Sequence, residues 1–252
     1  EKLTEVTSPT FNIMNEYNVG EITIKHYDLF RIKSYQEIED LNLFDNKKKS
    51  IFFIEWPQII KEKPKFVSRG GLKLEAAIQH FNIKVSGKIG LDIGASTGGF
   101  TDCLLQSGAF KVYAFDVGTN QLAWKIRNDE RVVSRENFNC RDIKQEDIDD
   151  QIDILVIDVS FISLYKILKP ASCIIKAGAD VVCLIKPQFE LKREQIGKGG
   201  IVKDQSLHHE ATVKVEKFAT NDLKMCHIGT INSPIKGAAG NTEFLAYFKQ
   251  LA

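Results

Sequence analysis

The sequence predicts an α/β fold in which an open, mostly parallel sheet is covered by helices on both faces and is closed by antiparallel strands. Three observations lead to this prediction. Mostly apolar runs at residues 89–93, 112–115, 152–157 and 181–185 have the length and apolar character of buried parallel strands. Segments with helical spacing of apolar residues lie between them. A glycine or a charged residue follows each run, at the strand end where open α/β sheets bind ligands.

The first of these strands, 89–93, leads directly into a glycine-rich turn. Gly94, Gly98 and Gly99 are expected to let the backbone pass close to a ligand, because a β-carbon would collide with it. Thr97 is expected to cap the helix that follows. The apolar positions that would pack this helix on the sheet are Phe100, Cys103, Leu104 and Leu105.

Two acidic residues indicate which ligand the turn would bind. The spacing is not G-x-G-x-x-G, and no Lys-Ser/Thr pair follows to grip phosphates. Asp116, at the end of the strand 112–115, is placed to accept the ribose hydroxyls of an adenosine. Asp92 adds a negative charge that would repel a pyrophosphate but suits the sulfonium and ammonium groups of S-adenosylmethionine. A site for S-adenosylmethionine is therefore favoured over a dinucleotide site.

Composition limits the classes of partner. The chain has 252 residues, 43% hydrophobic and 27% charged, with a net charge of +1, so a nucleic acid would have to be held by a local patch. No membrane-spanning run or signal peptide is visible. The cysteines are odd in number and form no C-x-x-C, which favours reduced thiols in the cytoplasm over disulfides or a metal site. They are Cys103, Cys140, Cys173, Cys183 and Cys226.

Residues 1–65 differ from the rest and are predicted to be a small, partial α/β segment. Ser34 is expected to cap an acidic helix that has Ile38 and Leu41 on one face. A buried strand at 51–54 would end in Glu55. An acid in this place can orient magnesium or water in NTPases, but on its own it is more often a solvated carboxylate.

A charged linker that contains Pro64 sets the domain boundary, which gives domains 1–65 and 66–252. Gly70-Gly71 is expected to form a turn before a helix over 72–81. The apolar positions expected on that helix are Leu72, Ala76 and Ile78. Arg69 and Lys73 precede the first strand, so they could lie over its mouth, although solvated surface cations are commoner.

The middle of the chain continues the alternation of helices and strands. Trp124, at the start of a helix, is expected in the core rather than as a platform for a base. A third strand at 132–133 leads into a polar loop, 137–142. This loop would put Asp142 or its neighbours near the adenine edge, although a plain turn explains them nearly as well. Two further strands end in Asp158 and Lys186, which become a candidate site if they face each other across the cleft.

The last third of the chain is expected to close the sheet. Residues 196–204 form a glycine-rich basic loop, either a flap over substrate or a plain crossover. A helix over 206–220 follows. It begins near His208 and His209, which are expected to be solvated because no second pair of metal ligands accompanies them. Antiparallel strands at 228–231 and 242–248 complete the sheet, with a long loop between them.

Eight ordered motifs between residues 66 and 252 resemble one protein family. They are VSRGGLKLEAAI, LDIGASTGGFTDCLL, VYAFDVG, QLAWKIRND, IDVSFISL, LIKPQFE, GKGGIVKD and GNTEF. Together they resemble the TlyA (hemolysin A) family of FtsJ-like ribosomal RNA ribose 2'-O-methyltransferases. The resemblance implies a Rossmann-like S-adenosylmethionine-dependent methyltransferase sheet and a catalytic tetrad of Lys73, Asp158, Lys186 and Glu243. The expected cofactor-binding residues are Asp92, Gly94, Ala95, Ser96, Thr97, Gly98, Gly99, Phe100, Asp116, Val117, Asn139 and Asp158.

The four residue types suit methyl transfer to a ribose. A ribose hydroxyl is a poor nucleophile at neutral pH and must lose its proton as the methyl group arrives. Lys186 could accept that proton if part of it is neutral, and burial beside the cation of Lys73 favours the neutral amine. Asp158 would orient Lys186, and Glu243 would fix Lys73 or the ribose. No metal is required.

Ribosomal RNA or ribosomal subunits are the expected partners, held by local charge rather than by the whole molecule. The candidate phosphate contacts are Arg69, Lys192, Arg193, Lys198 and Lys203, together with Lys73. In the family an S4-type RNA-binding domain precedes the SRGG stretch, whereas here residues 1–65 stand in that place. We therefore expect cofactor binding to be intact and docking of RNA to be altered. The oligomeric state is left open.

The motifs VTSPTFNIMNEY, HYDLFRI and FFIEWP resemble TsaE, the small P-loop ATPase of bacterial tRNA threonylcarbamoyladenosine synthesis. The resemblance implies that Thr10 lies near magnesium and that Asp28 and Glu55 are acidic site residues. The phosphate-binding loop that precedes SPTF in that family is absent from this sequence, so we expect an ATPase remnant without activity. A tRNA-modification ATPase and a membrane-acting haemolysin are the alternatives to the methyltransferase. The second has no basic amphipathic helix to support it.

Overall fold

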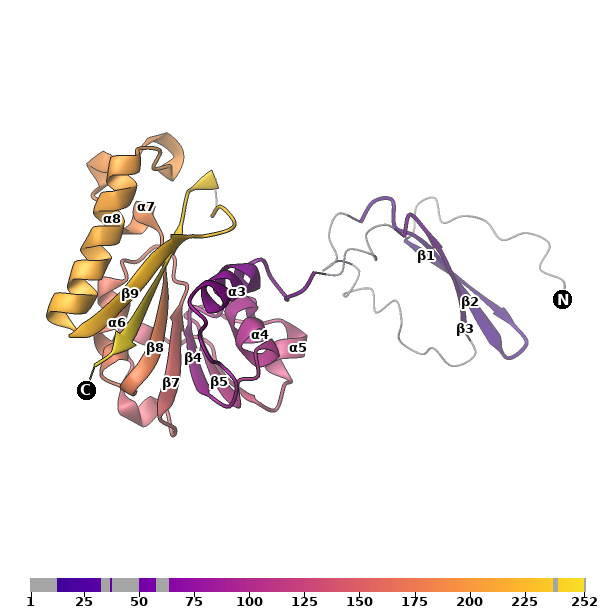
Figure 1. The fold of residues 1–252 in the computed structure, drawn as a ribbon. Coiled ribbons are helices and arrows are strands. Elements are labelled where there is room, and N and C mark those ends of the chain that lie inside the picture. Colours follow the sequence, from indigo (N-terminus) through magenta and orange to yellow (C-terminus); the bar gives the residue numbers. More distant parts are fainter. Residues whose placement is uncertain (1–12, 33–36, 38–49, 58–63, 238–239, 252) are drawn as a thin grey trace. The chain divides into compact units, whose positions relative to one another are not determined.

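The computed structural model describes residues 13–32, 37, 50–57, 64–237 and 240–251 (Figure 1). The chain divides into two compact units, Glu1–Pro64 and Lys65–Ala252. Each unit has its own sheet and its own hydrophobic cluster of side chains. The two units are therefore described separately.

The first unit contains a three-stranded sheet in the order β1-β2-β3. Its strands are β1 (Met14–Val19), β2 (Ile22–Asp28) and β3 (Ser50–Glu55). Strand β1 is antiparallel to β2, and β3 is parallel to it. Tyr27 and Leu29 are buried on one face of this sheet, against Phe52 and Ile54.

Strand β3 corrects one expectation, because it is not buried on both faces. Its side chains alternate, and Phe53 is 52% exposed. Glu55, at its end, pairs with His26 of β2, with Oε1 of Glu55 2.7 Å from Nε2 of His26. Asp28 accepts a hydrogen bond from the backbone N–H of Phe30. The predicted positions at Thr10, Ser34, Ile38 and Leu41 lie outside the described residues.

The second unit is built on a seven-stranded sheet in the order β6-β5-β4-β7-β8-β10-β9 (Figure 1). The strands are β4 (Ile89–Ile93), β5 (Lys111–Phe115), β6 (Val132–Arg135), β7 (Ile152–Ile157), β8 (Ile175–Ile185), β9 (Met225–Asn232) and β10 (Phe244–Gln250). Strands β4 to β8 pair in parallel with one another, and β10 lies antiparallel between β8 and β9. This is the predicted methyltransferase-like sheet with an antiparallel closing strand.

Helices cover both faces of this sheet. They are α3 (Gly70–His80), α4 (Gly99–Gln106), α5 (Trp124–Arg127), α6 (Tyr165–Ser172), α7 (Pro187–Glu190) and α8 (Gln205–Lys217), the last continued by a π-helical turn at Phe218–Asp222. Ile154 and Val156 of β7 pack in one cluster with side chains of α3 and α4, while Leu155 and Ile157 pack in another with side chains of α6. The alternation along one strand therefore separates two hydrophobic layers.

The helix over 70–80 differs from its prediction in the face that it buries. It begins at Gly70, so Gly70-Gly71 form its first turn rather than a separate turn. The buried positions are Gly71, Leu74 and Ala77, whereas Leu72 is exposed. Residues 71, 74 and 77 share one helix face because they are three apart, and Ile78 packs partly buried against the same cluster.

Trp124 was also wrongly expected in the core, since its side chain is 80% exposed. Helix α5 has a single turn, and Ile126 is the residue that it buries. Thr97 does not cap α4. Gly98 occupies that place, in the left-handed conformation with φ of 97° and with no side-chain cap, because the backbone must reverse direction there to enter the helix.

Candidate active site

The glycine turn after β4 is closely packed against other parts of the protein. Gly94 has a φ of 85°, and a β-carbon there would overlap the carbonyl oxygen of Asp158. At Gly98 a β-carbon would press on Leu122, and at Gly99 it would overlap the hydroxyl of Ser68. These glycines therefore also allow the turn to pack against the neighbouring strand end and helix, and their expected role beside a ligand stays a prediction.

A cavity of about 880 Å³ opens beside this turn, at the ends of β4, β5 and β7. Six residues predicted for the cofactor line it: Gly94, Ser96, Asp116, Val117, Asn139 and Asp158. A smaller adjoining pocket is lined by three more: Ala95, Gly99 and Phe100. Three others line neither pocket: Asp92, Thr97 and Gly98. Asp142 also lies outside the cavity, while its neighbour Arg141 lines it.

The carboxylate of Asp116 is held in a fixed orientation at the rim of the large cavity. Its Oδ2 accepts a hydrogen bond of 2.7 Å from the backbone N–H of Ser96, and its Oδ1 accepts one of 2.7 Å from Gly118. Each oxygen retains a lone pair for a further donor. The apolar ring of Phe138 lines the same cavity. A fixed acceptor beside an apolar wall fits the ribose and adenine of S-adenosylmethionine.

Asp92 lies beneath the turn and is fully buried. The hydroxyl of Thr101 donates a 2.7 Å hydrogen bond to its Oδ2, while Oδ1 has no partner. Burial raises the pKa of Asp92 from 3.8 to about 7, and the nearby charges of Asp158 and Asp116 act in the same direction. At neutral pH this group is therefore shared between its charged and neutral forms, and a cation nearby would favour the charged form.

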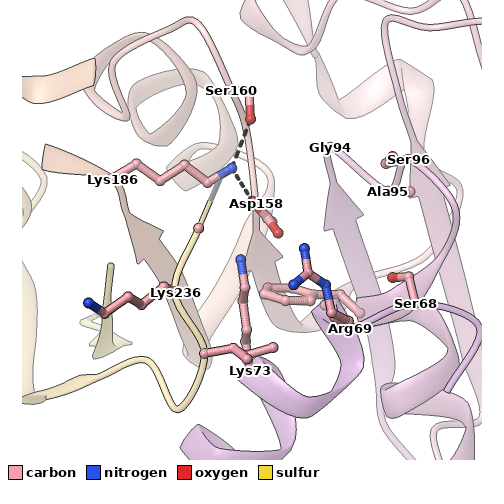
Figure 2. Close-up of a pocket in the computed structure, with 15 residues that line it drawn as sticks. Ser68, Arg69, Lys73, Gly94, Ala95, Ser96, Asp158, Ser160, Lys186 and Lys236 are labelled. Carbon is pink, nitrogen blue, oxygen red and sulfur yellow. Dashed lines mark hydrogen bonds and ion pairs between the residues drawn. The ribbon is translucent and has the colours of Figure 1, made fainter. Parts of the chain in front are cut away.

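Lys186 and Asp158 meet at the ends of two adjacent parallel strands, β8 and β7. Nζ of Lys186 lies 2.6 Å from Oδ1 of Asp158 in an ion pair. The same nitrogen donates a 2.8 Å hydrogen bond to the hydroxyl of Ser160 (Figure 2). The Lys186 side chain is 11% exposed. The two strand-end charges thus face each other, as the sequence suggested.

Lys73 and Glu243 form a second ion pair, with Nζ and Oε2 at 2.6 Å. Their side chains are 12% and 3% exposed. Lys73 projects from α3, and Glu243 directly precedes β10. Because β10 is antiparallel to β8, its first residue lies at the sheet edge where β8 ends. Gly237 packs so closely on Glu243 that a β-carbon would overlap the carboxylate.

One pocket of about 280 Å³ gathers these groups (Figure 2). Lys73, Asp158 and Lys186 line it. Glu243 does not line it but forms an ion pair with Lys73. Arg69 also lines it, so this predicted RNA contact lies at the site. The pocket shares Gly94, Ser96, Asp158 and Ser160 with the larger cavity. A group bound in one pocket would therefore adjoin a group bound in the other.

The other predicted RNA contacts lie elsewhere. Lys192, Arg193, Lys198 and Lys203 are all exposed, but none lines either pocket of the site. Lys203 instead lines a groove between α8 and the closing strands, together with His208 and His209. The ring of His208 is fixed by a 2.9 Å contact between its Nε2 and the carbonyl oxygen of Val202.

The structure adds residues that sequence reasoning did not assign to the site. Ser68, Ser160 and Lys236 line the small pocket. Phe161 lines the large cavity and is 91% exposed, with a φ of 64°. For Ser160 the signal was its place two residues after Asp158 in the motif IDVSFISL. For Lys236, in the loop before β10, the sequence offered none.

The second unit matches a known protein family. The model of the FtsJ-like methyltransferase family matches residues 66–250. The chain belongs to this family. This match confirms the resemblance that the sequence predicted over residues 66–252. It also confirms the methyltransferase activity and the S-adenosylmethionine cofactor that the resemblance implies.

Individual relatives of this FtsJ-like chain are similar over most of their length. "Hemolysin A" of Brachyspira hyodysenteriae is 52% identical over 191 residues, which cover 73% of this chain and 77% of the relative. The Mycobacterium tuberculosis "16S/23S rRNA (cytidine-2'-O)-methyltransferase TlyA" is 44% identical over 184 residues, which cover 73% and 68%. A crystal structure of a putative hemolysin from Lactococcus lactis superposes with a TM-score of 0.72 at 53% identity, covering 75% of this chain and 90% of that one.

The beginning of the chain matches a second family. The model of the threonylcarbamoyl adenosine biosynthesis protein TsaE matches residues 1–84, which confirms the resemblance of the first segment. Within the described residues, no helix is long and apolar enough to cross a membrane. The same residues contain no group of three His, Cys, Asp or Glu side chains placed to hold a metal ion.

Proposed function

We propose that the protein transfers a methyl group from S-adenosylmethionine to the ribose 2'-hydroxyl of a cytidine in ribosomal RNA. The observation that carries the proposal is the amine of Lys186, held 2.6 Å from Asp158 in a pocket that adjoins the large cavity. Membership of the FtsJ-like family supports it, as does the 44% identity to a relative named as an rRNA cytidine 2'-O-methyltransferase.

The cofactor would lie in the large cavity beside the glycine turn. Asp116 would accept hydrogen bonds from its ribose, and Phe138 and Cys140 would face its adenine. Asp92, beneath the turn, would add negative charge near its cationic end. S-adenosylmethionine supplies, when bound, an electrophilic methyl group whose departure leaves a neutral thioether.

Lys186 acts in this scheme as the general base. As the 2'-oxygen forms its new bond to carbon, the hydroxyl proton passes to Nζ of Lys186, which becomes an ammonium ion. Asp158 compensates that charge at 2.6 Å, and the product state is stabilised because both side chains are largely buried. The ammonium then returns its proton to solvent before the next turnover.

Lys73 and Glu243 position the ribose rather than take its proton. The ion pair with Glu243 fixes the Lys73 amine at the pocket wall. The remaining N–H groups of Lys73 can donate to oxygen atoms of the nucleotide, and Arg69 can contact a phosphate. Fixing the ribose in this way lowers the entropic part of the barrier.

The basic segment at 192–203 would extend the contact with RNA. Lys192, Arg193, Lys198 and Lys203 are exposed and free to reach phosphates. Such contacts are independent of sequence and weaken steeply with salt. We propose ribosomal RNA or ribosomal subunits as the partner, and the cytoplasm as the place of the reaction. The TsaE-like segment has no catalytic part in this scheme.

Replacement of Lys186 tests the proposal. Wild-type protein, Lys186→Ala and Lys84→Ala are incubated with ribosomal RNA and S-adenosylmethionine, and 2'-O-methylcytidine is measured by mass spectrometry of nucleosides. Lys84 is an exposed lysine outside the site and serves as the matched control. Lys186→Ala is expected to lose activity by a factor of about 10² to 10⁴, because the general base is gone.

Calorimetry then separates chemistry from binding. Lys186→Ala should still bind S-adenosylmethionine with an affinity close to wild type, since Lys186 lines the small pocket and not the large cavity. Full activity of Lys186→Ala, or no 2'-O-methylcytidine from the wild-type protein on any ribosomal substrate, would contradict the proposal. Tight binding of ATP without binding of the methyl donor would instead favour the ATPase alternative.

A further inference from the structure

We propose that Ser160 is a positioning residue that aims the amine of Lys186 at the substrate hydroxyl. This inference rests on the proposed role of Lys186 as the base. The Ser160 hydroxyl accepts a 2.8 Å hydrogen bond from Nζ of Lys186, on a different side of the nitrogen from Asp158 (Figure 2). Both partners come from the segment after β7, whereas Lys186 directly follows β8.

The valence of the amine explains why two partners matter. A neutral lysine amine has two N–H bonds and one lone pair, arranged around nitrogen as three corners of a tetrahedron. With Ser160 accepting one N–H and the Asp158 carboxylate 2.6 Å from the nitrogen on another side, the lone pair is directed away from both oxygens. The pocket lined by Lys73 and Arg69 lies beside this nitrogen. With Asp158 alone, the amine could rotate about its Cε–Nζ bond and the lone pair would have no fixed direction.

The loop that carries Ser160 is itself fixed to the segment after Lys186. Glu190 of α7 accepts a 2.6 Å hydrogen bond from the hydroxyl of Ser163 and a 2.8 Å bond from the backbone N–H of Leu164. Between Ser160 and these contacts, Phe161 has a φ of 64°, a conformation that bulky residues rarely adopt. Its ring lies 5.3 Å from that of Phe189, also on α7. The segment that follows Ser160 is thus fixed to α7.

Three single variants test Ser160. Ser160→Ala removes the acceptor, Ser160→Thr restores a hydroxyl, and Ser172→Ala is a matched control on α6, where the hydroxyl contacts the carbonyl of Lys169. The maximal kcat of Ser160→Ala is expected to fall about tenfold, because the base loses its orientation. Its pH–kcat midpoint should also move to lower pH, because an acceptor that stabilises the ammonium form is gone. Ser160→Thr should recover both values.

A second measurement needs neither RNA nor cofactor. Acetic anhydride acetylates a lysine only as the neutral amine, so the yield on Lys186, followed by peptide mass spectrometry across pH, gives the midpoint of its titration. Ser160→Ala should shift this midpoint to lower pH, and Ser160→Thr and Ser172→Ala should match wild type. A midpoint unchanged in Ser160→Ala, even with a lower kcat, would overturn the inference. Because this assay is independent of methyl transfer, it also separates failure of the inference from failure of the proposed function.

Discussion

Asp92 places an ionisable group where water does not reach it, and this has a consequence for stability. Burial raises the pKa of its carboxyl to about 7 in the folded protein, against 3.8 for an exposed aspartate. A group whose pKa is raised by folding adds stability at low pH, and that contribution is lost as the pH rises through the folded value. The folded protein should therefore lose free energy of unfolding between pH 5 and pH 8.

Asp92→Asn should abolish this dependence. The amide keeps the shape of the carboxyl and an acceptor for Thr101, but it has no charge to bury. Between pH 5 and pH 8 the wild type should lose about 3 kcal/mol of unfolding free energy that the variant does not lose. Urea unfolding at the two pH values, followed by circular dichroism, measures the difference. Asp142→Asn, at an exposed position, is the control; an equal pH dependence in wild type and Asp92→Asn would refute the assignment.

At the scale of elements, α7 acts as a clamp on the loop after β7. Glu190 is buried on this short helix, and burial raises the pKa of its carboxyl despite its bonds to Ser163 and Leu164. The backbone carbonyl of Glu190 also accepts a 3.0 Å bond from Lys214 of α8. The side chain of Glu190 therefore joins the loop after β7, which carries Asp158 and Ser160, to the segment that follows Lys186.

Glu190→Ala should release this clamp. The backbone N–H of Leu164 would be left buried without an acceptor, which costs about 1 to 3 kcal/mol of unfolding free energy. We also expect kcat to fall, because Ser160 lies on the released loop. Glu190→Gln retains an acceptor for Leu164 and should keep most of both properties. Urea unfolding and single-turnover methylation measure the two effects, and a Glu190→Ala variant with wild-type stability and rate would contradict the clamp.

The elements show which features were accessible from sequence. Strands β4, β5 and β7 were predicted because each is a mostly apolar run, and nearly all of their residues are buried. The inward face of α3 and the exposure of Trp124 were missed, because they depend on which residues another layer covers. The meeting of Asp158 and Lys186 followed from the parallel sheet alone. The sequence left two possible partners for Glu243, which were Lys73 and the ribose of the substrate. The spacing of the residues along the chain could not decide between them.

At the scale of the whole molecule, residues 65–252 have a hydrophobic core of their own. Two large clusters of buried side chains lie on the two faces of the seven-stranded sheet, and a third lies under α8. Every residue predicted for the cofactor or the tetrad belongs to this unit. The first unit has a separate small cluster around Tyr27 and Leu29. Each sheet is thus stabilised by contacts within its own unit.

A chain of residues 65–252 alone should therefore fold and bind S-adenosylmethionine as the full chain does. A 188-residue unit of this kind is large enough to bury a sizeable core without help. Thermal unfolding by circular dichroism and calorimetric titration with S-adenosylmethionine, both compared with the full chain, are the measurements. A shortened chain without cooperative unfolding, or one that no longer binds S-adenosylmethionine, would show that the first unit contributes to the core or to the cavity.

The ion pair between Lys73 and Glu243 joins side chains that are 170 positions apart in the sequence. Glu243 directly precedes β10, which lies between β8 and β9, so this pair can form only once that strand has joined the sheet. The arrangement of the catalytic lysines therefore depends on the last strand of the chain being in place, and loss of that strand would remove Glu243 together with part of the sheet.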